Sequence, residues 1–279
     1  MARPETRFAR NGDVRIAYQV VEQEGGDGPL DLILVPGLVS HLDLVWEEPL
    51  HAGFIRALAA IGRVILFDKR GTGLSDRDVA PPDLHTRMDD VRAVMDAAGA
   101  SRPVMLGISE GGMMSLAFAA AHPRQLRALV LYGAFAQSPT RAWPAHQVET
   151  RFDLVERAWG AQMMPPSVAP SMANDQEFRR GWGRFERKSA TAAMARALLR
   201  LSRDADVGPL LAGIRVPVLL LHRSGDRRVE IANSRALAAR IPGARLVELP
   251  GDDHLPHVGD SARLVAEIAA FAAAQAAVV

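Results

Sequence analysis

The sequence of 279 residues contains no cysteine. Disulfides, thiolate-bound metals and a cysteine nucleophile are therefore excluded. No apolar run is long enough to cross a bilayer, and residues 1–7 lack the continuous apolar core of a signal peptide. We therefore expect a cytoplasmic protein that does not interact with membranes.

An excess of either charge is also missing, because 33 Lys and Arg residues stand against 32 Asp and Glu residues. No basic block or basic stripe interleaved with aromatics occurs, so we expect no nucleic-acid partner. The glycines at 71 and 73 lack the third glycine and the following helix of a dinucleotide fingerprint. We expect no cofactor and a small-molecule substrate.

What the sequence does contain is a regular alternation of apolar strands and helices. A hairpin within residues 5–22, turning at Asn11-Gly12-Asp13, precedes them. Strands of the buried type are predicted at 30–35, 63–67 and 126–132, and further strands at 103–108, 216–222 and 245–249. Helices are predicted at about 49–60, 86–98, 113–121, 230–241 and 261–276. This order predicts an α/β fold: a mainly parallel, doubly wound sheet with antiparallel strands at its N-terminal edge.

The alternation stops after the strand that ends at Tyr132 and resumes at Val216. Residues 138–212 carry three of the four tryptophans and several helical patches. We interpret this segment as a helical cap inserted into a core formed by residues 1–137 and 213–279.

The hexapeptide Gly107-Ile108-Ser109-Glu110-Gly111-Gly112 lies between a predicted strand and an Ala-rich helix. A serine flanked by glycines at such a junction is typical of a nucleophile elbow, a turn too tight for Cβ atoms two residues either side of the serine. The start of the helix directs backbone N–H groups toward any negative charge that forms beside the serine. The pattern therefore predicts acyl transfer on Ser109.

A serine hydroxyl needs a base, and the order expected in this fold is serine, acid, histidine. His254 follows the last predicted strand and precedes the last helix, as the base should. His257, three residues later, is the competitor, and we interpret it as a supporting or surface residue.

The candidate acid is Asp226, which follows the strand ending at His222 and could reach the ring of His254. A turn or helix-capping aspartate is the alternative reading of this residue. Asp204 and Asp206 belong to the insertion and fit worse, and no acid follows the strand that ends at Tyr132.

The oxyanion formed in acyl transfer needs two hydrogen-bond donors. We expect the backbone N–H groups of Glu110 and Leu38 to supply them, and Asp68 and Arg70 to link loops near the elbow by charged hydrogen bonds. The residues predicted to line the substrate pocket are Gly37, Trp46, Trp143 and Met163.

A metal site is the alternative use of the polar residues around His254. Neither a two-histidine helical pair with glutamate nor a histidine-rich box accompanies them, so we expect no metal. The residues concerned are Asp252, Asp253, His254, His257 and Asp260.

Taken together, the motifs resemble the α/β-hydrolase superfamily over about residues 5–274. The matching pieces are Pro36-Gly37, Asp68-x-Arg70-Gly71-x-Gly73-x-Ser75, the elbow, Gly225-Asp226 and Gly251 to His254. More narrowly, residues 67–75, 87–93 and 109–112 are similar to hydrolase modules associated with adenylate or guanylate cyclase domains. Pro36 stands where many members of the superfamily have histidine before the oxyanion-loop glycine.

The resemblance implies a triad of Ser109, Asp226 and His254 under a helical cap, and usually ester hydrolysis. We therefore expect a serine hydrolase that cleaves a carboxylic ester or lactone through an acyl-enzyme, as a monomer or homodimer. Hydrolysis of C–C bonds, thioesters or amides and perhydrolysis remain open, because the same triad serves them all. A ligand-sensing module with vestigial activity is the alternative outside enzymes, whereas serine at 109 argues against dehalogenases and epoxide hydrolases.

Overall fold

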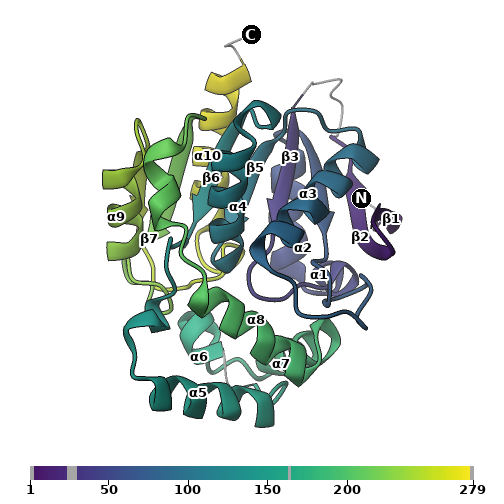
Figure 1. Cartoon of the computed structure of the whole chain (residues 1–279), viewed down its shortest axis with the longest axis vertical. Helices are drawn as coiled ribbons and strands as arrows, with labels where there is room; N and C mark the ends of the chain where they lie inside the picture. Colours follow the sequence, from purple (N-terminus) through teal and green to yellow (C-terminus); the bar gives the residue numbers. More distant parts are fainter. Residues whose placement is uncertain (1–2, 24–29, 163–164, 277–279) are drawn as a thin grey trace.

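The computed structural model describes residues 3–23, 30–162 and 165–276. Its centre is an eight-stranded sheet with the order β1-β2-β4-β3-β5-β6-β7-β8 (Figure 1). The hairpin of β1 and β2 pairs antiparallel to β4, and all other neighbours are parallel. The strands are β1 (Arg7–Asn11), β2 (Val14–Val21), β3 (Asp31–Val35), β4 (Arg63–Phe67), β5 (Val104–Ile108), β6 (Ala128–Tyr132), β7 (Val218–Arg223) and β8 (Arg245–Leu249). The predicted α/β fold is confirmed.

Helices cover both faces of the sheet, which explains why its central strands are apolar at nearly every position. Successive residues of a strand face opposite sides, so Ile33 packs in one core and Leu32 and Leu34 in the other. The first core lies under α3 (Leu84–Ala98), α4 (Glu110–Ala121) and α9 (Ala232–Arg240), and the second under α2 (Pro49–Ala59) and α10 (Ser261–Ala276).

Local signals explain where the helix α3 begins and ends. The side chain of Asp83 caps its first turn by accepting from the N–H of Thr86, and Gly99 ends it in the left-handed conformation, with φ of 68°. The six-residue helix α1 (Leu42–Glu47) was not predicted. Its N-cap residue, His41, makes no side-chain cap hydrogen bond, so the sequence carries no start signal there.

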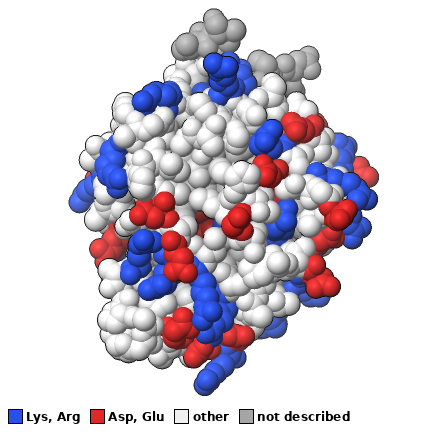
Figure 2. Space-filling view, in the orientation of Figure 1, with Lys and Arg blue, Asp and Glu red and all other residues white. Residues whose placement is uncertain are grey.

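Among the described residues, four α-helices and three short 3-10 helices follow β6 and precede β7, and the α-helices lie together across one end of the sheet in Figure 1. This group, the inserted helices, consists of α5 (Ala145–Arg157), α6 (Pro165–Val168), α7 (Gln176–Ser189) and α8 (Ala192–Asp204). Arg196 of α8 pairs with Glu149 at 2.8 Å, with Glu156 at 3.0 Å and with Asp153. Figure 2 shows acidic and basic side chains interspersed over this end of the molecule. None of the described helices combines the length and hydropathy needed to cross a membrane.

Candidate active site

Ser109 occupies the junction between β5, which ends at Ile108, and α4, which begins at Glu110. Its φ of 54° and ψ of −121° are strained for a residue with a side chain. A Cβ on Gly111 would collide with the carbonyl oxygens of Val35 and Pro36, and one on Gly107 with the side chain of Ser115. The glycines are needed because the loop after β3 and the helix α4 pass so close to the turn.

The structure brings Ser109, His254 and Asp226 together, although they lie after three different strands. The Oγ of Ser109 lies 2.7 Å from Nε2 of His254, and Nδ1 of His254 lies 2.6 Å from Oδ2 of Asp226. Because an ionised carboxylate only accepts, Nδ1 carries the proton, which leaves Nε2 free to accept from the serine hydroxyl. His254 and Asp226 are each 4 % exposed, so their pairing is shielded from water.

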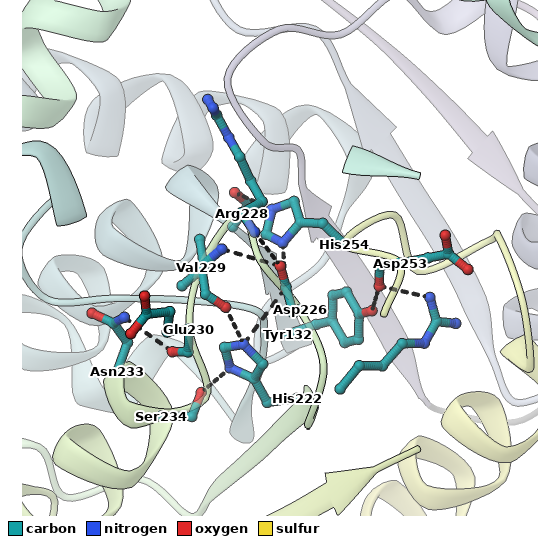
Figure 3. Close-up of polar contacts among 12 residues, drawn as sticks. Tyr132, His222, Asp226, Arg228, Val229, Glu230, Asn233, Ser234, Asp253 and His254 are labelled. Carbon is teal, nitrogen blue, oxygen red and sulfur yellow. Dashed lines mark hydrogen bonds and ion pairs between the residues drawn. The ribbon is translucent and has the colours of Figure 1, made fainter. Parts of the chain in front are cut away.

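The carboxylate of Asp226 is held by its own turn as well as by His254 (Figure 3). Its Oδ1 accepts from the N–H of Arg228 at 2.8 Å and of Val229 at 3.1 Å. Burial alone would raise the pKa of Asp226, but His222, His254 and the Val229 N–H hold that pKa well below its ordinary value. The aspartate is therefore ionised when it faces the imidazole.

His222, at the end of β7, is a fully buried residue that sequence reasoning did not assign to the site. Its Nε2 lies 2.7 Å from the carbonyl of Val229 and 3.5 Å from Oδ2 of Asp226, while Nδ1 lies 2.6 Å from Oγ of Ser234. A carbonyl only accepts, so Nε2 carries a proton that also points toward Asp226. The signal in the sequence was a histidine at the strand end, four residues before the acid.

Two backbone N–H groups lie beside Ser109 without hydrogen-bond partners among the described residues. Glu110 is the first residue of α4, so its N–H has no intrahelical acceptor. The loop that carries Leu38 touches the elbow: a Cβ on Gly37 would lie 3.7 Å from Cβ of Ser109. Glu110 thus follows the serine directly and the loop that carries Leu38 touches the elbow, while binding of an oxyanion by their two N–H groups stays a prediction.

The side chain of Glu110 forms a buried cluster with two cations from distant parts of the chain. Arg87 of α3 contacts its carboxylate at 2.5 and 3.0 Å, and Nζ of Lys69 lies 2.7 Å from Oε2. Burial would raise the pKa of Glu110, but the two cations lower it to about 2, while burial lowers the pKa of Lys69 to about 8. At neutral pH all three are charged, so the cluster carries a net positive charge beneath the elbow.

Asp68 and Arg70, predicted to link loops near the elbow, serve different partners. Asp68 is fully buried and accepts from the N–H groups of Leu42 at 3.1 Å and Leu74 at 2.8 Å. Burial raises its pKa to about 6 despite these bonds. Arg70 binds Asp90 of α3 at 2.7 and 2.5 Å. Each therefore fixes the loop after β4, one to the start of α1 and the other to α3.

A cavity of about 530 Å³ opens at Ser109 and His254, between the strand ends and the inserted helices. Gly37 lines it as predicted, together with Leu38 and, from the insertion, Trp159, Trp182, Phe178 and Val168.

Two of the other predicted lining residues do not reach this cavity, and one lies outside the described part of the chain. Trp46 turns toward the sheet, where its indole N–H donates to Oε1 of Gln19 at 2.7 Å. Trp143 lies on the surface with 42 % of its area exposed. Met163 lies outside the described residues.

His257 is a buried wall residue of the cavity, so the surface alternative for it was wrong. Its ring stacks on that of His51 with centroids 4.1 Å apart, and its Nε2 lies 3.9 Å from Glu48. Burial lowers the pKa of His51 to about 4 and that of His257 well below its ordinary value. No three acidic or histidine side chains among the described residues are grouped as a metal site would require.

Known proteins share this fold over nearly the whole chain. A protein of Azorhizobium caulinodans, named as the carbamate hydrolase RutD, is 31 % identical over 88 % of this chain and 91 % of its own. The structure of an esterase from a Rhodococcus species is 26 % identical, covers 96 % of this chain and 98 % of its own, and superposes with a TM-score of 0.76. A hydrolase structure from Pseudomonas aeruginosa superposes with a TM-score of 0.80 at 24 % identity, over 95 % of this chain and 97 % of its own. The family model of the alpha/beta hydrolase fold matches residues 32–260, and with the sheet order, the elbow and these relatives we conclude that the chain belongs to the α/β-hydrolase fold family.

Proposed function

We propose that this protein is a serine hydrolase that cleaves a carboxylic ester or lactone through an acyl-enzyme on Ser109. The observation that carries the proposal is the hydrogen-bonded line from Ser109 through His254 to Asp226, of which Ser109 and His254 line a cavity. Each member has the environment that its role needs: a strained turn that presents the hydroxyl, a shielded imidazole and an ionised carboxylate.

In the proposed reaction, Nε2 of His254 takes the proton of Ser109 as the serine oxygen attacks the substrate carbonyl. Asp226 holds the imidazole through Nδ1 and stabilises the imidazolium that forms. The oxyanion binds the N–H groups of Leu38 and Glu110, and the imidazolium then protonates the leaving alcohol. A water activated by His254 attacks the acyl-enzyme, and the carboxylic acid leaves.

We also propose that residues 138–212 act as a cap over a core of residues 1–137 and 213–279. Support comes from Trp159, Val168, Phe178 and Trp182, which line the cavity from the insertion while Ser109 and Leu38 line it from the strand ends. An apolar wall of this kind suits a moderately apolar acyl or alcohol group.

Hydrolysis of a carbamate is the second candidate, favoured by the relative that carries that name at 31 % identity. With a carbamate ester the same alcohol leaves, but a carbamoyl group instead of an acyl group stays on the serine, and water then releases it as a carbamic acid. Similarity to an esterase at 26 % identity supports the ester. A sensing role, which the resemblance to cyclase-associated modules permits, would need ligand binding without turnover.

The proposal is tested by intact-mass analysis after incubation with a fluorophosphonate, in the wild type and in Ser109→Ala, followed by peptide mapping. A single adduct on Ser109 that is absent from the variant is the expected result. Hydrolysis of 4-nitrophenyl esters and of a matched carbamate then ranks the two candidate substrates. Failure of the folded wild type to form an adduct would overturn the serine hydrolase and favour the sensing role.

A further inference from the structure

Arg228 is a cation in the cavity wall that no carboxylate neutralises. It lies two residues after Asp226, is partly buried, and lines the cavity with Ser109 and His254. Its side chain extends away from Asp226 in Figure 3, and no interaction is marked at its guanidinium. Among the described residues, this guanidinium has neither a hydrogen bond nor an ion pair, although the backbone N–H of Arg228 is bound.

The charged groups near Arg228 do not neutralise it. Asp226 is close, but its Oδ1 already accepts two backbone N–H groups and its Oδ2 faces His254. Arg151 of α5, an exposed residue, approaches from the inserted helices and repels the guanidinium. Burial and this repulsion both lower the pKa of Arg228.

Three acids of the same cavity wall, the exposed Glu47, the half-buried Glu48 and the buried Glu186, already have partners. Glu47 pairs with Arg184, and Glu48 caps α2 through the N–H of Leu50. Glu186 accepts from the indole of Trp182 at 2.8 Å and from the N–H of Gly160 at 3.0 Å. Arg228 therefore presents a charged guanidinium at the cavity that is available to bind a ligand.

A guanidinium removed from water is unfavourable until an anion meets it, and its planar fork matches a carboxylate. We propose that Arg228, with Arg151 beside it, binds a carboxylate of the substrate, so that the enzyme acts on esters that carry a second, free carboxylate. This inference rests on the proposed hydrolase function and narrows its substrate class to acidic esters.

The test compares substrates that differ only in this charge. The first pair is 4-nitrophenyl valerate and the mono-4-nitrophenyl ester of glutaric acid, which places a carboxylate where valerate has a methyl group. The second pair is methyl 4-acetoxybenzoate and 4-acetoxybenzoate, which places the charge on the leaving group. We expect Arg228→Gln to lower kcat/KM for the anionic member of one pair at least tenfold and to leave both neutral esters within twofold.

Arg227→Gln is the matched control, because Arg227 is the exposed neighbour and should change neither ratio. Arg228→Lys should retain part of the preference, since it keeps the charge without the fork. Equal loss on neutral and anionic esters, or unchanged ratios for both pairs, would overturn the proposal.

A binding measurement separates this inference from the hydrolase function, because it needs no turnover. Glutarate should raise the melting temperature of the wild type and of Arg227→Gln but not of Arg228→Gln. Stabilisation by inorganic phosphate and not by glutarate would overturn the carboxylate assignment. The wild type could form the Ser109 adduct and yet show neither stabilisation by glutarate nor a preference for anionic esters. That result would support the hydrolase function and overturn the carboxylate-binding role of Arg228.

Lys69 is a buried cation that contacts both segments from which the oxyanion donors are proposed to come. Its Nζ donates to the carbonyl oxygen of Gly37 and to Oε2 of Glu110, and its side chain is 2 % exposed. The Gly37 carbonyl belongs to the same peptide unit as the Leu38 N–H, and Glu110 carries the other proposed oxyanion donor. One buried ammonium group therefore touches both halves of the oxyanion hole.

In a trans peptide the C=O and the N–H point in opposite directions, so a fixed carbonyl also fixes the N–H. A cation on the carbonyl further polarises the unit and strengthens the N–H as a donor. We infer that Lys69 is a positioning residue, which aims the Leu38 N–H at the oxyanion and anchors the start of α4 through Glu110.

Lys69→Met should lower kcat at least tenfold with little change in KM, as expected when an interaction made only in the transition state is lost. Arg70→Met is the matched control. Arg70 lies in the same loop and pairs with Asp90, but it contacts neither Gly37 nor Glu110. Lys69→Gln, which keeps a donor without the charge, should fall between the wild type and Lys69→Met.

The pH profile adds a readout that a merely structural role would not move. Lys69 is faced by Glu110 from α4 and by Arg87 from α3, and its pKa is about 8. The kcat of the wild type should therefore decline above about pH 8, and this decline should be absent from Lys69→Met. An unchanged kcat in Lys69→Met, or a loss matched by Arg70→Met, would overturn the positioning role.

Discussion

Two sets of buried charges meet at this site, and they differ in whether the protein itself neutralises them. Beneath the elbow, Glu110 binds both Arg87 and Lys69. In the cavity wall, the guanidinium of Arg228 makes no hydrogen bond or ion pair with an acidic side chain among the described residues, although Asp226 is near enough to attract it. The paired charges hold backbone that must stay in place, whereas the unpaired charge is free to meet a ligand. Stability and substrate preference should therefore respond to different variants.

The largest expected effect on stability comes from removing the carboxylate of the paired charges beneath the elbow. Glu110→Gln leaves the cations of Arg87 and Lys69 buried without a carboxylate, which should lower the free energy of unfolding by about 3 to 5 kcal/mol. Urea denaturation followed by circular dichroism measures this loss. The double variant Lys69→Met/Glu110→Gln should recover part of it, because one buried cation is gone. A loss under about 1 kcal/mol in Glu110→Gln would contradict the assignment.

Acid should break the same set without a mutation. The pKa of Glu110 is lowered from 4.5 to about 2, so its contribution to stability is complete above about pH 4.5 and is lost as the pH falls toward 2. The expected loss is about 3 kcal/mol of unfolding free energy over this range. Subtracting the profile of Glu110→Gln from that of the wild type isolates it, since Asp226 titrates in both proteins. If unfolding free energy depended on pH in the same way in both proteins, the assignment of this acid-induced loss to Glu110 would be wrong.

The sequence allowed the positions of Ser109, Asp226 and His254 to be predicted, for a physical reason. Each follows a strand with a clear apolar signal, and the carboxyl ends of parallel strands gather at one edge of a sheet. The same reasoning predicted the hairpin at the N-terminus and the insertion between β6 and β7. Local signals and topology were sufficient because no side-chain packing had to be known.

Features that depend on side-chain partners far apart in the chain were not predicted. Only the backbone N–H of Glu110 was given a role, and its carboxylate was given no partner, because nothing in the sequence links it to Arg87 or Lys69. Trp46 was placed in the pocket, but its indole finds Gln19 on β2 instead. Composition shows that a tryptophan will be buried, and only the packing of distant elements decides which wall it joins.

An intermediate effect, on the reactivity of Ser109, is expected from His222. Its ring contacts Val229 and Asp226 and so supports the turn that carries the catalytic acid. His222→Phe removes the hydrogen bonds to Val229 and Ser234 and the proton that faces Asp226. We expect the rate of Ser109 labelling by a fluorophosphonate to fall about tenfold, or about 1.4 kcal/mol, because the carboxylate is held less firmly. His222→Gln, which can keep a donor toward Val229, serves as the control. Equal labelling rates in all three proteins would remove His222 from the site.

The smallest effect on stability should come from the residue with the largest effect on substrate preference. Arg228→Gln breaks no ion pair and removes a charge whose burial is unfavourable, so its free energy of unfolding should stay within about 0.5 kcal/mol of the wild type. Arg227→Gln provides the exposed reference in the same urea experiment. A loss above about 1.5 kcal/mol would give Arg228 a structural role like that of Arg87. Glu110→Gln should lose several times more unfolding free energy than Arg228→Gln. The two variants therefore distinguish a charge that the fold requires from one that a ligand requires.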